Sequence, residues 1–186
     1  MSILQDIRDF RPLCEQEERD KAVTLAFLAA NPDAFFRENL VAHMTASAWT
    51  VNRARDRVLL VYHRLYDSWA WTGGHADGEE DLLAVALREC REETGVLHVR
   101  PVSEKIYSLE TLTVDGHEKR GVYVPSHLHL NVTYLLEADE RDTLHVCEAE
   151  NSGVRWFTLA EALTVPSEPW MIERVYRKLN ERLKSF

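Results

Sequence analysis

Residues 74–96 read GHADGEEDLLAVALRECREETGV, and three of their carboxylates, Glu89, Glu92 and Glu93, fall at relative positions i, i+3 and i+4. On an α-helix these positions share one face. Like charges this close repel one another by roughly 0.2–0.5 kcal/mol per pair. A divalent cation offsets that repulsion, because Mg²⁺ prefers a few carboxylate oxygens together with phosphates and waters. The segment therefore predicts a helix that carries a metal site, and the alternative is a surface helix whose acidic residues are merely solvated.

Apolar residues and glycines set the expected limits and buried face of this helix. The apolar residues recur at helical spacing and lie apart from the glutamates: Leu83, Ala86, Leu87 and Cys90. Gly95 follows the last turn, where a left-handed cap is common. Gly73-Gly74 precedes the helix, and paired glycines allow a sharp turn or a close approach to a ligand. The expected unit is a glycine loop followed by a helix with one apolar and one acidic face.

The spacing of this segment resembles the Nudix box of the Nudix hydrolase superfamily. From Gly74, five residues lead to Glu80, and seven more lead to Arg88-Glu89. The apolar Cys90 and the free position 91 then precede the run from Glu92 to Val96. All nine constrained positions in these 23 residues are filled, which is far more specific than an isolated glycine motif. Hydrophobic strands on either side extend the resemblance, more weakly, over roughly residues 42–165.

The resemblance implies a metal centre and assigns a role to each residue of the box. Glu89, Glu92 and Glu93 would be the metal carboxylates, and the carbonyl of Gly73 a further ligand. Arg88 would orient the glutamates by ion pairing. Glu80 would support the loop or a second metal ion, with Gly74 and Gly95 as the motif glycines. The implied cofactor is Mg²⁺, with Mn²⁺ as a substitute.

The general base is left open between two parts of the chain. Glu89 is one candidate. Family members also recruit a carboxylate from a loop ahead of a late strand, and here that loop, Cys147 to Gly153, offers Glu148 and Glu150. Each of these two residues, taken alone, is more often a solvated loop residue than a base.

Three histidines are candidate substrate contacts. His127 and His129 alternate on a predicted strand, so both side chains face the same way. Such a pair binds a transition metal or a phosphate, but no third ligand is evident, and a role in substrate binding or packing is favoured. His75 directly follows the glycine pair, where a phosphate oxygen would be near, and is expected to contact substrate.

Composition excludes several partners. The 186 residues include 22 basic and 31 acidic side chains, a net charge of −9, and no long basic run, so a nucleic-acid polymer is not expected to bind. The three cysteines lack metal-binding spacing and are expected to be free thiols. The first ten residues do not resemble a signal peptide, and no apolar run reaches membrane-spanning length. We expect a cytoplasmic protein with no membrane partner; its oligomeric state is open, a homodimer included.

The expected fold is α/β (in the α+β sense), and the resemblance specifies a Nudix-type α/β/α sandwich with a mixed sheet. Residues 1–41 should be a helical extension packed on the core, and residues 42–186 the Nudix hydrolase domain. The pattern predicts helices over 15–30, 34–40, 159–163 and 168–183, a loop over 115–126, and strands over 45–51, 57–63, 69–71, 99–112, 127–137 and 154–157.

The implied function is metal-dependent hydrolysis of a phosphoanhydride (diphosphate) bond in a nucleoside diphosphate linked to another moiety, by attack of an activated water on phosphorus. One alternative is a non-catalytic, nucleotide-sensing Nudix domain, but such domains usually lose box glutamates. The other is an isopentenyl-diphosphate isomerase, whose chemistry requires a cysteine where this chain has Gly73. Flanking markers for ADP-ribose, dinucleoside polyphosphates and coenzyme A are missing; position 111, for example, is Thr111. The substrate stays open.

Overall fold

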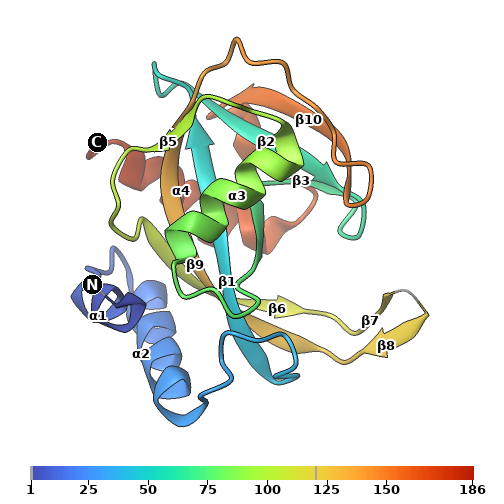
Figure 1. Ribbon diagram of the computed structural model, residues 1–186. Coiled ribbons are helices and arrows are strands. Elements are labelled where there is room, and N and C mark those ends of the chain that lie inside the picture. The colour runs from blue at the N-terminus through green and yellow to red at the C-terminus, as the bar shows by residue number, and fades with distance from the viewer. Residues whose placement is uncertain (1, 120) are drawn as a thin grey trace.

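A mixed eight-stranded sheet runs through the centre of the protein (Figure 1). The computed structural model describes residues 2–119 and 121–186. The main path of the sheet runs β10-β2-β1-β9-β5, while β3, β4 and β6 pair with β2, β1 and β9 respectively. The bounds of these strands are β1 (Ala42–Val51), β2 (Arg57–His63), β3 (Ser68–Ala70), β4 (Thr72–His75), β5 (Val99–Pro101), β6 (Ser108–Val114), β9 (His127–Ala138) and β10 (Asn151–Thr158).

Helices cover both faces of this sheet. They are α1 (Ile3–Asp9), α2 (Glu15–Ala30), α3 (Leu82–Thr94), the short 3₁₀-helix η1 (Glu161–Leu163), the π-helix η2 (Met171–Tyr176) and α4 (Arg177–Leu183). In Figure 1, α3 crosses the front of the sheet and α4 lies behind it. The predicted α/β/α sandwich with N-terminal helices is thus confirmed. Among the described residues, no helix combines the length and the apolar character needed to cross a membrane.

Each face of the sheet has its own apolar core, because side chains alternate along a strand. Met44 and Ala46 of β1 pack with Ile7 of α1 and Leu82 of α3. The odd-numbered residues at the far end of β1, such as Trp49, pack instead with the C-terminal helices. The odd-numbered residues nearer its start are polar, and they face the cavity described below.

The structure corrects the expected environment of α3 in two ways. Gly73 and Gly74 lie in β4, paired with Ser47 and Ala46 of β1, rather than in a loop. They are needed for close approach, because a Cβ on Gly74 would lie 2.5 Å from Glu89 Cδ. The stripe that faces the core is Leu82, Val85, Ala86, Cys90 and Glu93, whereas Leu83 and Leu87 are only half-buried. A box glutamate therefore lies on the buried side of the helix.

Two other predicted elements differ from the structure, and a third is present with a local irregularity. Residues 34–40 form turns rather than a helix, and their backbone hydrogen bonds join residues three apart, from Phe36 N to Asp33 O and from Asn39 N to Phe36 O. The expected loop over 115–126 contains a hairpin of β7 (His117–Lys119) and β8 (Val122–Val124), with Gly121 at φ 77° just before β8. The helix expected over 168–183 is confirmed as a continuous helical run over 169–183, in which η2 is π-helical and α4 follows it.

Candidate active site

A cavity of about 810 Å³ lies between α3, the polar ends of β1, β4, β6 and β9, and the segment before β10. It brings together most of the candidate residues, namely Gly73, Gly74, His75, Glu89, Glu92, Glu93, His127, His129 and Glu150. Arg88 is not among the lining residues, but it forms an ion pair with Glu89, which is. In the part of the chain that the structure describes, Glu80, Gly95 and Glu148 are not among the lining residues.

Glu93 is the most buried carboxylate of the site, with 3% of its surface exposed. Its Oε1 accepts from the amide of Gly73 at 2.8 Å, and its Oε2 accepts from Asn151 Nδ2 at 3.0 Å. Burial raises the pKa of Glu93 to about 8 despite these two donors. The carboxylate is thus held in one orientation but is costly to ionise without a cation.

Glu89 lies over the glycine pair and faces the same cavity. Burial raises the pKa of its carboxyl group, and the nearby charges of Glu92 and Glu150 add to the rise. Arg88 opposes this effect through an ion pair of 2.9 Å between Arg88 Nη2 and Glu89 Oε1. That ion pair holds Glu89 in a defined position at the end of β4.

The donors around these glutamates fit a hard divalent cation. Glu89, Glu92, Glu93 and Glu150 all line the cavity, so its acidic wall offers carboxylate oxygens without sulfur or nitrogen ligands among them. Mg²⁺ and Mn²⁺ prefer such oxygen sets. Burial is the main cause of the raised pKa values of Glu89 and Glu93, because it disfavours the ionised carboxylates, and a bound cation would offset that cost.

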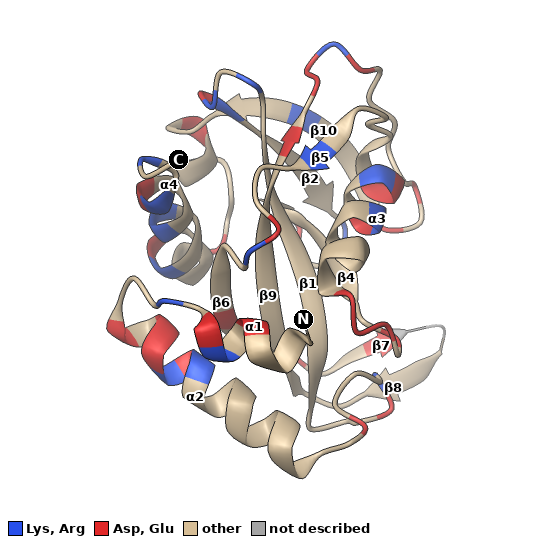
Figure 2. Cartoon of the chain, turned by 60° about the vertical axis from the view of Figure 1, so that its left-hand side comes forward, with Lys and Arg blue, Asp and Glu red and all other residues tan. Residues whose placement is uncertain are grey.

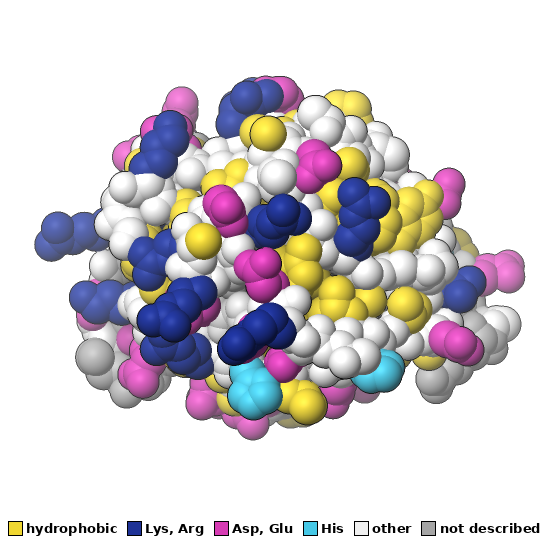
Figure 3. Space-filling view, turned by 90° about the horizontal axis from the view of Figure 1, so that it is seen from above, with side chains coloured by type: hydrophobic (Ala, Val, Ile, Leu, Met, Phe, Trp, Pro, Cys, Tyr) yellow, Lys and Arg dark blue, Asp and Glu magenta, His cyan; other side chains and the backbone are white. Residues whose placement is uncertain are grey.

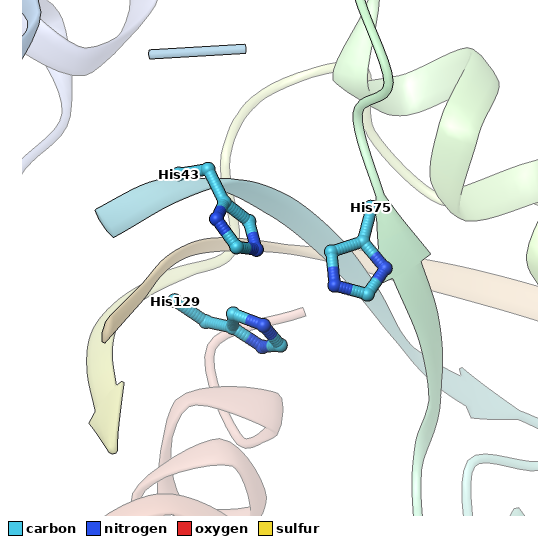
Figure 4. A group of neighbouring side chains, drawn as sticks. All are labelled: His43, His75 and His129. Carbon is cyan, nitrogen blue, oxygen red and sulfur yellow. The ribbon is translucent and has the colours of Figure 1, made fainter. Parts of the chain in front are cut away.

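Histidines also line the cavity. His127 and His129 lie on the same side of β9, with their Nε2 atoms 3.2 Å apart. His75 at the end of β4 and His43 at the start of β1 complete the group (Figure 4). The ring centroid of His43 lies 5.1 Å from that of His75 and 5.0 Å from that of His129. Burial lowers the pKa of His43 and of His129, so both rings are neutral at neutral pH.

His43, Asn131 and Asn151 are site residues that the sequence reasoning missed. Asn131 joins neighbouring strands, because its Oδ1 accepts from Thr45 at 3.0 Å and from Ser47 at 2.9 Å. Its Nδ2 donates to Glu110 at 3.1 Å. The sequence did contain a signal for His43, because the polar residues His43, Thr45 and Ser47 alternate with apolar ones. The same segment is also typical of an ordinary buried strand, so the signal did not point to a site.

Comparison with known proteins shows what class of protein carries this site. The model of the NUDIX domain family matches residues 41–179. The chain therefore belongs to the Nudix family, and it is a Nudix hydrolase. The resemblance seen in residues 74–96 is confirmed.

Individual relatives are more distant. The chain is 23% identical over 174 residues to the "Probable DHNTP pyrophosphohydrolase" of Lactococcus lactis subsp. cremoris (strain MG1363), covering 94% of this chain and 96% of the relative. Two solved structures have the same fold. A C. elegans Ap4A hydrolase in a binary complex gives a TM-score of 0.54 at 22% identity, over 77% of this chain and 98% of that one. A Nudix-family hydrolase from Clostridium perfringens gives a TM-score of 0.56 at 19% identity, and the match covers 77% of this chain and 97% of that one.

Proposed function

We propose that the protein hydrolyses a phosphoanhydride bond in a nucleoside diphosphate derivative, with Mg²⁺ held by Glu89, Glu92 and Glu93 and by the carbonyl of Gly73. The observation that carries the proposal is the group of carboxylates on one wall of a cavity of about 810 Å³. When bound, the cation supplies charge neutralisation at the phosphates and lowers the pKa of water. Mn²⁺ has the same preference for oxygen ligands and would substitute.

The protein groups hold the reacting atoms in place. The Gly73 amide and Asn151 fix Glu93, and Arg88 fixes Glu89. Arg64 also lines the cavity, where its Nε donates to the carbonyl of Asn151, and we propose that its guanidinium binds a phosphate of the substrate. His75, His127 and His129 line the remainder of the substrate cavity.

We assign the general base to Glu150 in preference to Glu148. Glu150 lines the cavity, while its exposed carboxylate stays available to accept a proton from the attacking water. Glu89 is the alternative base, although its ion pair with Arg88 suits a metal ligand better. Gly74, Gly95 and Glu80 are proposed to maintain the conformation of the Nudix box and not to contact the substrate.

The rest of the proposal concerns partners and location. A small molecule is favoured over a nucleic-acid polymer, because the net charge is −9. On the face seen in Figure 3, basic and acidic side chains are interspersed. The free thiols of Cys14, Cys90 and Cys147 favour the cytoplasm. Residues 1–41 are proposed as an extension of the hydrolase domain at 42–186, since Ile3 and Ile7 lie in its core.

The test is cleavage of the phosphoanhydride with and without a divalent cation, followed as formation of the two phosphorylated products. A panel of nucleoside diphosphate derivatives, Ap4A and DHNTP would be assayed with the full chain after exhaustive chelation and then with Mg²⁺ or Mn²⁺ restored. We expect turnover only with the cation, and a loss of orders of magnitude in kcat for Glu92→Gln. Glu104→Gln, an exposed residue outside the cavity, is the matched control. Full activity after chelation would refute the mechanism, and no turnover on any substrate would favour the sensor.

A further inference from the structure

Three adjacent strands bring histidines from distant parts of the chain to one point. β1 and β9 are parallel, and His43 pairs in register with His129. β4 runs antiparallel on the other side of β1, with His75 opposite Thr45. Thr45 is two residues from His43 and so faces the same way. The three rings therefore lie on one face of the sheet.

The ring nitrogens of these histidines converge. One nitrogen from each of His43, His75 and His129 can be chosen so that all lie within 4.8 Å of one another. In Figure 4 each ring turns a nitrogen toward the space between them. Zinc–nitrogen bonds of about 2.0–2.1 Å place the nitrogens of a tetrahedral site about 3.3 Å apart. Inward movement of each ring by less than about 1 Å would give that geometry.

We propose that His43, His75 and His129 bind a divalent transition-metal ion such as Zn²⁺, at a site separate from the carboxylate wall. We refer to these three residues as the histidine triad. The triad goes beyond the proposed hydrolysis, which requires only the glutamates.

The surroundings of His43 are those of a metal ligand. Its Nδ1 lies 3.1 Å from the carbonyl oxygen of Asn39, an acceptor, so Nδ1 carries the proton and Nε2 keeps its lone pair. Nε2 is buried and has no hydrogen-bond partner among the described residues, and only 3% of the residue is exposed. Metal-bound histidines usually donate their other ring N–H to such a carbonyl. An unpartnered buried nitrogen is otherwise costly, and a metal ion would satisfy it.

Neighbouring residues enclose the histidine triad without supplying a competing charge. His127 stacks on His43 at 4.9 Å between centroids and contacts His129, which closes one side. The charge of Arg37, which acts on His43 and His129, is ion-paired with Asp77. The triad residues also line the cavity, so a three-ligand site would keep an open coordination position toward it, as catalytic zinc sites do.

Ligand chemistry separates this site from the proposed magnesium site. Imidazole nitrogens suit zinc, nickel, copper and iron, whereas carboxylate and carbonyl oxygens suit magnesium. The two sites would therefore hold different metals in one cavity. Excess Mg²⁺ should saturate the carboxylates and leave the histidine triad open to Zn²⁺.

The test is Zn²⁺ binding to the full-length, metal-depleted protein in excess Mg²⁺, measured by competition with a chromophoric chelator. We expect one equivalent to bind tightly, and Co²⁺ to give the visible absorption of a four-coordinate site. His43→Gln and His129→Gln should each weaken Zn²⁺ binding by about 100-fold or more. His75→Gln, at a less buried position, gives the same test if a buried variant fails to fold.

Two control variants distinguish this proposal from the hydrolase mechanism. His98→Gln, at an exposed histidine that pairs with Asp142 and does not line the cavity, should leave Zn²⁺ binding unchanged. Glu92→Gln should reduce Mg²⁺-dependent turnover but not Zn²⁺ affinity. The absence of a stoichiometric Zn²⁺ site, or equal Zn²⁺ affinity in folded His75→Gln and wild type, would overturn the histidine triad without affecting the glutamate mechanism.

Discussion

Asn151 Nδ2 donates a hydrogen bond of 3.0 Å to Glu93 Oε2, which connects the first residue of β10 to the last turn of α3. The other carboxylate oxygen accepts from the amide of Gly73 at 2.8 Å. Both oxygens of a buried glutamate are thus held from elements outside its own helix. Glu93 is a proposed metal ligand, and its orientation therefore depends on β10. That strand directly follows the loop that carries Glu150, the proposed general base.

Asn151→Ala should weaken the metal site while leaving the fold intact. Loss of a residue that orients a metal ligand typically costs 10–100-fold in metal affinity or activity. We expect the Mg²⁺ concentration for half-maximal activity to rise by about that factor. The measurement is initial rate against Mg²⁺ concentration, with the exposed neighbour Ser152→Ala as control. An unchanged Mg²⁺ requirement in Asn151→Ala would show that Glu93 does not need this donor.

The stability of the metal-free protein should fall as pH rises, because of Glu93. Burial raises its pKa from 4.5 to about 8 in the folded chain. Between these values the folded state holds a proton that the unfolded state has lost, so unfolding becomes easier as pH increases. In chelator, the Tm of wild type should therefore drop more between pH 5 and 8 than that of Glu93→Gln. Parallel Tm curves for the two proteins would contradict this assignment.

The parts of the fold that depend on nearby residues could be predicted from sequence. The helix expected over 15–30 is confirmed by α2, and the box helix by α3, which ends at Thr94 and is capped by Gly95 at φ 75°. Caps, turns and helical periodicity are set within a few residues. The hairpin of β1 and β2 is confirmed for the same reason.

The missed features depend on pairing between distant segments. His43 lies beside His129 only because β1 and β9 are parallel neighbours, and nothing in either strand specifies that partner. Burial of Glu93 depends on donors from β4 and β10. The sequence identified the three carboxylates of the box, but their unequal burial follows from tertiary packing.

Glu150→Gln and Glu148→Gln form a matched pair that tests the general base. Only Glu150 of the two lines the cavity. If it accepts the proton of water, Glu150→Gln should lower the single-turnover rate by about 10²–10⁴-fold, while Glu148→Gln stays near wild type. Substrate affinity should change little in both, because a base acts mainly in the transition state. Unchanged rates in both variants would return the role to Glu89.

Glu17→Ala tests how the N-terminal helices are joined to the hydrolase core. Glu17 of α2 is fully buried and ion-paired with Arg182, and it lies 3.5 Å from Lys178 Nζ. Figure 2 shows the charged start of α2 close to the charged helix α4. Lys178 also pairs with Glu110 of β6 at 3.0 Å, so the group of charges reaches the sheet.

Removing one partner from such a group leaves buried charge uncompensated, so Glu17→Ala should lower the free energy of unfolding by about 3–5 kcal/mol. Urea denaturation of the full chain measures this change. Glu18→Ala, the exposed neighbour on the same helix, should change it by less than about 0.5 kcal/mol. A single, less stable transition in Glu17→Ala is expected if residues 1–41 fold with the core. An unshifted main transition would mean that the N-terminal helices form a separate unit.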